Sequence, residues 1–362
     1  MPLVTLFYNN NNLISQNNLS SCTINGGVTS YKNNIYGVTK NGGQGFGNIY
    51  KYSTDDNIIT ILYEFSEYDN NGIHPNENMI VSKDETVLYG TCSEGGYNGQ
   101  GTVFSIPIIG GKPTVLHTFN QYDNKGICPD GGLTLDKSGQ NLYGACYLGG
   151  NGFGTIYSIS IPTKSITLLH AFDGINASSP DGGVRLSEDE SLVYGAYLFG
   201  AYGYGAIFSV PITGGDQKDQ GKLNILYAFE KNGLNGANPN GGLLLSDDKT
   251  GFYGTCLSGG LYNEGTIFFI SLTGSVTSLY SFKQNNLNGI VPNGWLVQHE
   301  NKLYGTCSSG GFYNKGTIFS FSLESQTIDH VHSFDIANPN GGLTLHNNIL
   351  CGTTSNCVYQ LI

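Results

Sequence analysis

The sequence predicts an all-β fold, a seven-bladed β-propeller with four-stranded antiparallel blades, from three observations. One phrase occurs six times, and a degraded seventh copy closes the chain. The spacings between successive tyrosines of the phrase are 53, 54, 51, 59 and 51 residues. Each repeat contains four short strand patterns, and the N-terminal segment supplies the strand that the last repeat lacks. A fixed period of this length is typical of modular β arrays.

The phrase is clearest between Leu88 and Phe104, where it reads Leu-Tyr-Gly-Thr-Cys, then Gly-Gly, then Gly-Thr-Val-Phe. Its other complete copies begin at Tyr36, Tyr143, Tyr194, Tyr253 and Tyr304. In the repeat that contains Tyr143, a first strand follows a Pro-Asp-Gly-Gly turn, and further strands are expected at 142–146, 155–159 and 166–172. Short β-branched and aromatic runs between Gly, Asn, Asp and Pro are typical of antiparallel strands.

The two ends of the chain predict how the ring closes. The last repeat, 339–362, contains three strand patterns and lacks the fourth. Residues 3–8 match the fourth strand of other repeats, such as 59–63, so we expect this N-terminal strand to complete the last blade. This pairing would remove two exposed sheet edges, which otherwise promote aggregation. We therefore expect residues 1–362 to form a single propeller domain.

The charge and composition exclude several classes of partner. The net charge is −11, only 12% of residues are charged, and Arg185 is the single arginine. Nucleic-acid binding requires a basic surface, which this sequence lacks, and an anionic membrane surface is disfavoured for the same reason. No apolar run approaches the ~20 residues of a membrane-spanning helix. The N-terminus lacks the basic and apolar regions of a signal peptide. These features predict an intracellular or virion-associated protein.

Six of the eight cysteines fall into two groups. Cys92, Cys146, Cys256 and Cys307 share one slot of the repeat. Equivalent positions in neighbouring repeats should lie farther apart than the ~7 Å Cα separation that a disulfide tolerates, so we expect reduced, buried thiols. Cys351 and Cys357 flank a predicted tight turn. Their spacing is compatible with a disulfide across a hairpin and with two free thiols.

The phrase resembles the Gloeobacter–Verrucomicrobia tandem repeat, whose core reads roughly Leu-Tyr-Gly-Thr-Thr, Gly-Gly, Gly-Thr-Val-Phe. Residues 88–104 and 303–319 match this core nearly throughout, and the resemblance extends over essentially the whole chain. It implies a propeller-like array and carries no catalytic residues with it. The composition, rich in Asn and poor in Arg, also resembles that of proteins from AT-rich genomes, such as those of giant amoebal viruses or amoebae.

The glycine-rich loops of the repeats form the predicted contact surface. In a four-stranded blade, the loop between strands two and three lies on the same rim as the connection to the next blade. Loops around a rigid scaffold are the usual place for binding residues. Aromatic rings beside amide groups suit neutral glycans or a protein partner; the alternative is that these rings only cover the turns. The residues predicted for this surface are Phe46, Tyr97, Asn98, Phe153, Tyr202, Tyr204, Tyr262, Asn263, Trp295, Phe312 and Tyr313.

No residue pattern predicts catalysis, a metal or a cofactor. His117, His170 and His332 share a slot that Tyr or Phe fills in other repeats, which indicates a packing position. Asp130 and Asp181 share a slot with asparagines, as expected for residues that close a turn. The glycine-rich loops join two strands and open no helix, so the context of a phosphate-binding loop is absent.

Three functions remain compatible with these observations. The leading prediction is a non-enzymatic binding or scaffold module that engages a protein or glycan through the glycine-rich loops. The alternatives are a lectin-like protein with repeated sugar pockets and an enzyme with one active site at the mouth of the central channel. Trp295, the only tryptophan, replaces the second glycine of an inter-blade turn. It is expected either to plug the channel or to present a binding platform.

Overall fold

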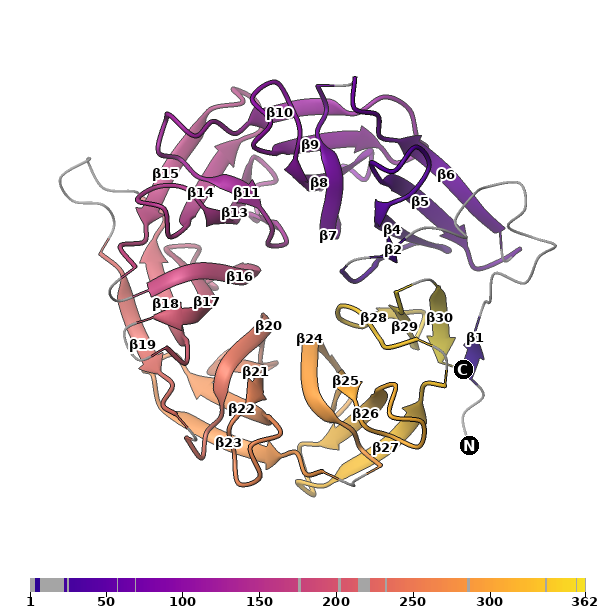
Figure 1. The fold of residues 1–362 in the computed structure, drawn as a ribbon, viewed down its shortest axis with the longest axis vertical. Helices are drawn as coiled ribbons and strands as arrows, with labels where there is room; N and C mark the ends of the chain where they lie inside the picture. The colour runs from indigo at the N-terminus through magenta and orange to yellow at the C-terminus, as the bar shows by residue number, and fades with distance from the viewer. Residues whose placement is uncertain are drawn as a thin grey trace.

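Seven antiparallel sheets are arranged as blades around a central axis (Figure 1). The computed structural model describes residues 4–6, 23–24, 26–56, 58–68, 70–174, 177–200, 203–213, 222–231, 233–284, 287–335, 337–355 and 357–361. Strands account for all the regular secondary structure of these residues. The predicted seven-bladed propeller is therefore confirmed.

The first four blades contain strands β2 to β19. Blade 1 contains β2 (Thr23–Ile24), β3 (Thr29–Tyr31), β4 (Asn34–Asn41), β5 (Asn48–Ser53) and β6 (Ile58–Glu64). Blade 2 contains β7 (Ile73–Val81), β8 (Val87–Glu94), β9 (Thr102–Pro107) and β10 (Thr114–Thr118). Blade 3 contains β11 (Ile127–Pro129), β12 (Thr134–Leu135), β13 (Asn141–Leu148), β14 (Thr155–Ser160) and β15 (Ile166–Ala171). Blade 4 contains β16 (Ala177–Leu186), β17 (Leu192–Gly200), β18 (Ala206–Pro211) and β19 (Asn224–Ala228).

The remaining three blades include the closing one. Blade 5 contains β20 (Ala237–Leu245), β21 (Gly251–Ser258), β22 (Thr266–Ser271) and β23 (Val276–Ser281). Blade 6 contains β24 (Ile290–His299), β25 (Lys302–Ser309), β26 (Thr317–Ser322) and β27 (Ile328–Ser333). Blade 7 contains β28 (Thr344–His346), β29 (Ile349–Thr353), β30 (Val358–Leu361) and the N-terminal strand β1 (Val4–Leu6). Strand β1 pairs with β30 in the register Thr5 opposite Gln360, as the sequence predicted.

The repeated phrase is explained by one packing contact inside each blade. Gly90 on β8 lies opposite Phe104 on β9, and a Cβ on Gly90 would be 2.7 Å from Cζ of that ring. The glycine therefore makes room for the aromatic side chain of its cross-strand partner. Phe104 is fully buried, and its cluster joins residues of blades 1 and 2. The hydrophobic core thus lies between neighbouring blades, which is why the phrase recurs once per blade.

The innermost strands differ from the prediction at the Pro-Asn/Asp-Gly-Gly segment. The sequence suggested a turn that precedes the first strand. In blades 2, 4, 5 and 6, β7, β16, β20 and β24 begin before the proline, and the register shifts within the segment. In blade 3, β11 and β12 flank it as two short strands. The two residues after the Asn or Asp, which are both glycines in blades 4 and 5, interrupt the ladder as a bulge does, so that the strand continues in a new register.

A repeated joint ties each glycine-rich loop to the next blade. The residue before the proline adopts a left-handed conformation in five blades, as at Cys128 with φ 54° and Val291 with φ 56°. Its amide donates a hydrogen bond to a carbonyl of the preceding blade, as from Cys128 to Gln100 at 3.0 Å. A Cβ on Gly101 would be 2.5 Å from Cδ of Pro129, so this loop glycine lies against the proline. These contacts hold the loops in fixed positions relative to the ring.

Candidate functional site: a loop rim and a divided central channel

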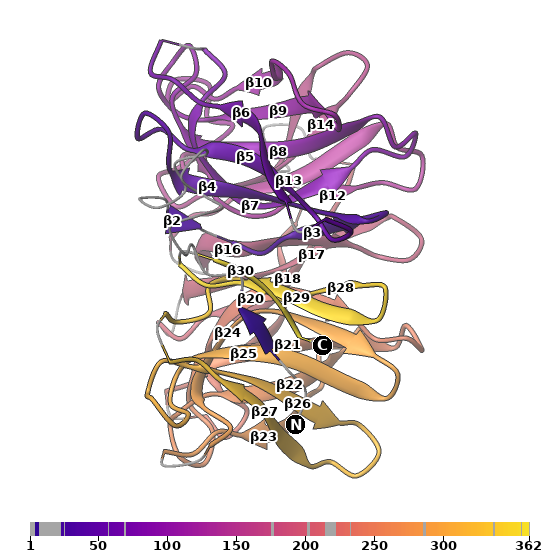
Figure 2. The same cartoon turned by 90° about the vertical axis from the view of Figure 1, so that its right-hand side faces the viewer.

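The two rims of the ring differ in the apolar side chains that they expose. We call the rim formed by the loops between second and third strands and by the connections between blades the glycine-rich rim. The opposite rim holds the turns between first and second strands and between third and fourth strands, such as the turn from β3 to β4 (Figure 2). Of the fifteen large hydrophobic side chains exposed among the described residues, twelve lie on the glycine-rich rim. The exposure of apolar surface is therefore concentrated on one face.

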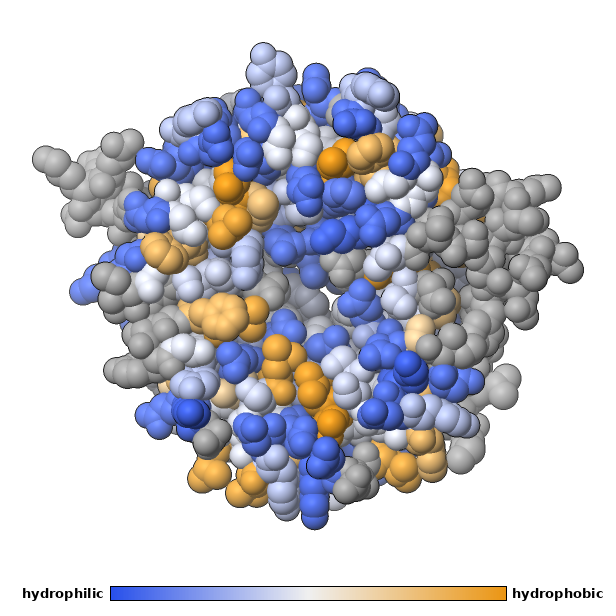
Figure 3. All heavy atoms as spheres, viewed as in Figure 1, coloured by the Kyte–Doolittle hydropathy of each residue, from blue (hydrophilic) through white to orange (hydrophobic). Residues whose placement is uncertain are grey.

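Figure 3 shows the glycine-rich rim with its hydrophobic residues in separate patches among hydrophilic side chains. Its centre is hollowed. Most monomeric proteins expose single apolar residues, and a repeated set on one rigid face is the more informative observation.

Five of the predicted aromatic residues are exposed on this rim. Tyr97 is the most accessible at 80%, and the others range from 64% to 41%. The five are Tyr97, Phe153, Tyr262, Phe312 and Tyr313. Two contacts hold these rings partly in place: Lys283 Nζ lies 5.1 Å from the ring centroid of Tyr262, and Phe312 meets the His330 ring edge-on at 5.7 Å. These rings are accessible, yet partly ordered by neighbours.

The remaining predicted aromatic residues are placed differently. Phe46 and Tyr204 are half-buried and pack against core clusters, so they contribute mainly to blade packing. Trp295 lies in the central channel on β24 and is only 9% exposed. Tyr202 lies outside the described residues.

The asparagines of the loops stabilise the loops themselves. Asn263, with φ 59°, accepts a hydrogen bond from the amide of Gly259 through its side chain at 3.1 Å. Asn314 does the same for the amide of Gly310 at 3.1 Å. Asn98 donates to the carbonyl of Phe119 at 3.2 Å, across to the connection that leaves its own blade. Asn98 and Asn263 are therefore exposed residues whose amides are already engaged.

The connections between blades contribute exposed residues that sequence reasoning missed. Tyr68 is 90% exposed and Tyr122 is 82% exposed, each on a connection that reaches the glycine-rich rim. Leu234 and Leu287 occupy similar connections in later blades. The signal was available, because apolar residues in polar Asn-rich connections have no packing partner in the strand pattern. The residues predicted for the rim came mainly from the loops between second and third strands.

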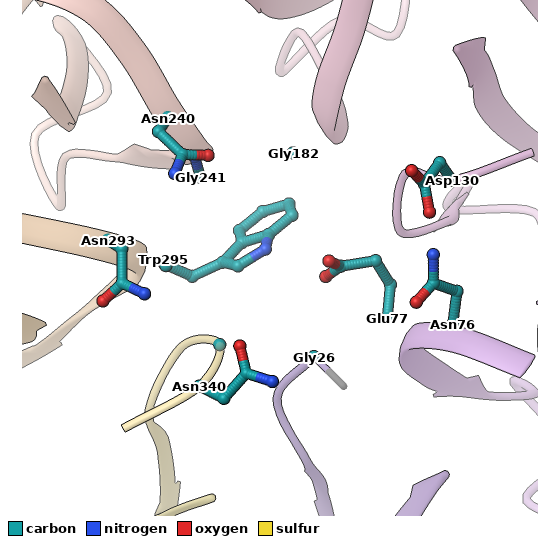
Figure 4. A pocket seen from close by; sticks show the side chains of 12 residues that line it. Gly26, Asn76, Glu77, Asp130, Gly182, Asn240, Gly241, Asn293, Trp295 and Asn340 are labelled. Carbon is teal, nitrogen blue, oxygen red and sulfur yellow. The ribbon is translucent and has the colours of Figure 1, made fainter. Parts of the chain in front are cut away.

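The channel contains a polar chamber at the glycine-rich rim. We call it the rim chamber; its volume is about 210 Å³. Figure 4 shows the indole of Trp295 extending from β24 into the middle of this chamber, with Glu77 facing it. The Asn/Asp slot of the Pro-Asn/Asp-Gly-Gly segment supplies the side chains around it, namely Asn76, Asp130, Asn240, Asn293 and Asn340. The sequence indicated turn-closing roles for this slot, and the ring brings its members together.

Glycines from other blades make room for Trp295. A Cβ on Gly242 would lie 2.1 Å from Cε3 of the indole, and a Cβ on Gly183 would lie 3.0 Å from Cζ2. A Cβ on Gly132 would lie 3.7 Å from Cζ2, which is an ordinary contact. These glycines occupy the repeat position that Trp295 occupies in blade 6. Because they have no side chains, the indole fits between them. The indole therefore lies within the channel, and both expected roles for Trp295 stay predictions.

A second chamber lies on the other side of the indole. We call it the inner chamber; its volume is about 410 Å³. Trp295 lines both chambers and separates them. On the inner side, the only arginine stacks on the only tryptophan, with Arg185 Cζ 4.0 Å from the ring centroid of Trp295. Two residues that no sequence pattern associates therefore meet on the axis of the ring.

The histidines and cysteines that occupy two repeated slots serve as packing groups. Each ring of His117, His170 and His332 lies edge-on to the phenylalanine two residues later, with 4.9 to 5.0 Å between ring centroids. The predicted packing role of this slot is confirmed. Cys92, Cys146, Cys256 and Cys307 are buried free thiols, and burial raises the pKa of each. They are therefore poor nucleophiles.

The two C-terminal cysteines are also free thiols. Cys357 Sγ lies 2.9 Å from the hydroxyl of Thr354, and Cys351 Sγ lies 3.8 Å from the carbonyl of Ile349. No group of three His, Cys, Asp or Glu side chains close enough to hold a metal ion occurs within the described residues. In the same part of the chain, no helix has the length and apolar character needed to cross a membrane.

Comparisons with known proteins agree with the repeat and the fold. A family model of the Gloeobacter/Verrucomicrobia repeat matches residues 7–208 and 177–359. No curated protein sequence matches the chain. Among solved structures, a streptogramin B lyase superposes with a TM-score of 0.64 at 16% identity, covering 95% of each chain.

Two further structures extend this similarity. The WD40 β-propeller domain of Doa1 has a TM-score of 0.66 at 11% identity, covering 100% of this chain and 97% of its own. An oligogalacturonate lyase from Vibrio parahaemolyticus has a TM-score of 0.61 at 11% identity, covering 99% and 96%. At such low identities these similarities show the propeller fold alone.

Proposed function

The chain belongs to the Gloeobacter/Verrucomicrobia repeat family, and from that premise we propose that it is a non-enzymatic binding or scaffold module that contacts its partner through the glycine-rich rim. One observation carries the proposal, the concentration of exposed large hydrophobic side chains on that rim. Burying such side chains is the main source of association free energy, and aromatic residues are the commonest anchors.

The rigidity of the rim supports this proposal. The loop asparagines bond to loop backbone, and in five blades the left-handed residue before the proline bonds the preceding loop to its blade. A preorganised surface loses little conformational entropy when it binds, so more of the contact free energy appears as affinity. Exposed Tyr97 and Phe312 therefore lie on loops whose conformation should change little on binding.

The chemistry of the rim favours a protein or a neutral glycan as the partner. The net charge of −11 opposes polyanionic ligands, and the one arginine lies in the channel rather than on the rim. Aromatic rings stack on the apolar faces of sugars and also pack against protein side chains. Separate patches suit either several glycan units or one broad protein surface.

A glycan array and affinity capture, performed in parallel with the wild-type protein, test the proposal. A scaffold binds one partner protein at a fixed stoichiometry and leaves the array silent. A lectin-like module binds a defined neutral glycan at several sites per chain. If neither assay yields saturable binding, the proposed function is wrong.

A further inference from the structure

The inner chamber contains a cation whose contacts do not include a negative charge. Arg185 donates from Nε to the carbonyl of Leu243 at 3.1 Å and from Nη1 to the hydroxyl of Thr134 at 3.5 Å. One face of its guanidinium stacks on Trp295. Within the part of the chain that the structure describes, no carboxylate forms an ion pair with it. Two of five N–H donors are engaged, and the others remain available to a ligand.

Placing a charge in this position is unfavourable without compensation. Arg185 is half-buried, and burial lowers the pKa of Arg185 to about 10, so the side chain still carries its proton at neutral pH. A partly buried charge also loses some of its hydration, so an anionic partner is favourable at this position. Other blades place Thr29, Leu244 and Val297 in the same slot, so blade packing does not require an arginine. The charge therefore points to a ligand.

The chamber walls limit what that ligand is. The residues around the chamber are mixed in character. Val28, Met79 and Leu133 are buried in the cores between blades, whereas Ile80 and Leu135 are partly exposed. The polar residues of the wall are Thr29, Ser30, Asn78, Thr134 and Thr344. The volume of about 410 Å³ lies in the range of small-molecule sites. A phosphate dianion would meet only one positive charge, in a wall of mixed polar and apolar residues. A monoanion with an apolar body matches both features.

We propose that the inner chamber binds a small organic monocarboxylate, whose carboxylate pairs with the free N–H donors of Arg185 and whose short apolar part lies against Ile80 and Leu135. A guanidinium presents parallel N–H groups that match the two oxygens of a carboxylate. Arg185 stacks on Trp295, which restrains its guanidinium, and both residues line the chamber. This site is separate from the glycine-rich rim and does not depend on the proposed rim function.

The site contains its own reporter, because Trp295 is the only tryptophan and touches Arg185. Tryptophan fluorescence of the full chain is followed while butyrate or hexanoate is added, with butanamide and hexanamide as neutral matched probes and inorganic phosphate as a second anion. We expect a saturable change with the carboxylates below roughly 10 mM, no saturable change with the amides, and a weaker effect of phosphate. Hexanoate should bind more tightly than butyrate, because it buries more apolar surface.

Variants connect the response to Arg185. Arg185→Gln should weaken carboxylate binding at least ~10-fold, the equivalent of one charge-assisted hydrogen bond. Lys164→Gln removes one positive charge from an exposed turn and should leave binding unchanged. Arg185→Lys keeps the charge without the paired donors and should bind with intermediate affinity. Thermal melts and far-ultraviolet circular dichroism establish that each variant is folded.

Several results would overturn the proposal. They are the absence of a saturable carboxylate response in the wild-type protein, equal binding of the amides, tighter binding of phosphate, or unchanged binding in folded Arg185→Gln. If neither Arg185 variant folds, the comparison of acids with amides in the wild-type protein decides, because only pairing with a cation distinguishes these matched probes.

Discussion

At the scale of single residues, Trp295 depends on the absence of side chains elsewhere. Its indole occupies the axis because blades 3, 4, 5 and 7 have glycine in the corresponding slot. The contact is close at Gly242 and ordinary at Gly132, although the two glycines are equivalent in their repeats. The indole therefore leans toward blade 5.

This asymmetry predicts different effects of the same substitution. Gly242→Ala should lower the free energy of unfolding by about 1–3 kcal/mol, the usual cost of overpacking, whereas Gly132→Ala should have little effect. In a Trp295→Ala background, Gly242→Ala should lower the free energy of unfolding much less, because the indole that the new methyl group contacts is absent. Urea denaturation of the single and double variants measures this coupling. Additive effects of Gly242→Ala and Trp295→Ala would contradict the proposed contact.

The histidines predict how stability depends on pH. Burial lowers the pKa values of His117, His332 and His346 below the usual 6.5. The unfolded chain then binds more protons than the folded chain as pH falls through 6.5, so the free energy of unfolding should decrease from pH 8 to pH 5.5.

A repeat-swapping variant tests the source of this pH dependence. His332→Tyr introduces the residue that Tyr280 provides in the same slot of another blade, and it removes one titrating group. The difference between urea denaturation at pH 8 and at pH 5.5 should shrink in this variant. A difference that stays as large as in the wild-type protein would assign the effect to other groups.

At the scale of elements, the joint before each proline places an unusual demand on one residue. His74, Cys128, Ser179, Asn238 and Val291 all adopt φ values between 54° and 57°. A β-branched residue is the least suited to this region, and asparagine is among the best suited. The repeat therefore contains a joint whose geometry is kept while its residue varies.

Exchanging residues between two joints tests this explanation. Val291→Asn should raise the free energy of unfolding by about 1 kcal/mol, because it relieves left-handed strain. Asn238→Val should lower it by a larger amount, because the hydrogen bonds of Asn238 to Leu198 and Ser258 are also lost. Chemical denaturation measures both. If Val291→Asn is destabilising, left-handed strain does not limit the stability of this joint.

At the scale of the whole molecule, ring closure rests on the backbone pairing of β1 with β30. Removing residues 1–8 should expose the edge of β30, lower the melting temperature and promote self-association. A synthetic peptide of residues 1–10 should restore the melting temperature, and sedimentation should show a return to the wild-type state. An unchanged melting temperature after truncation would show that this pairing adds no stability.

The sequence allowed the whole-molecule fold to be predicted better than the site. Seven copies of one phrase, with a strand exchanged between the ends, specify a closed ring because each copy has the same packing requirement. The channel could not be predicted in the same way. Arg185 and Trp295 are 110 residues apart in the chain, and only ring geometry brings blades 4 and 6 to one axis. The rim was predicted from its glycines, whereas Tyr68 and Tyr122 lie on less regular connections.

The binding of two matched variants tests whether the glycine-rich rim is the contact surface. Tyr97→Ala combined with Phe312→Ala removes two exposed rings from this rim, and Ile109→Ala removes an 88% exposed side chain from the opposite rim. With the glycan or protein that the wild-type protein binds, the rim variant should lose at least ~10-fold in affinity, and Ile109→Ala should bind as wild type does. Unchanged binding by the rim variant together with loss in Ile109→Ala would contradict the assignment of the contact surface to the glycine-rich rim.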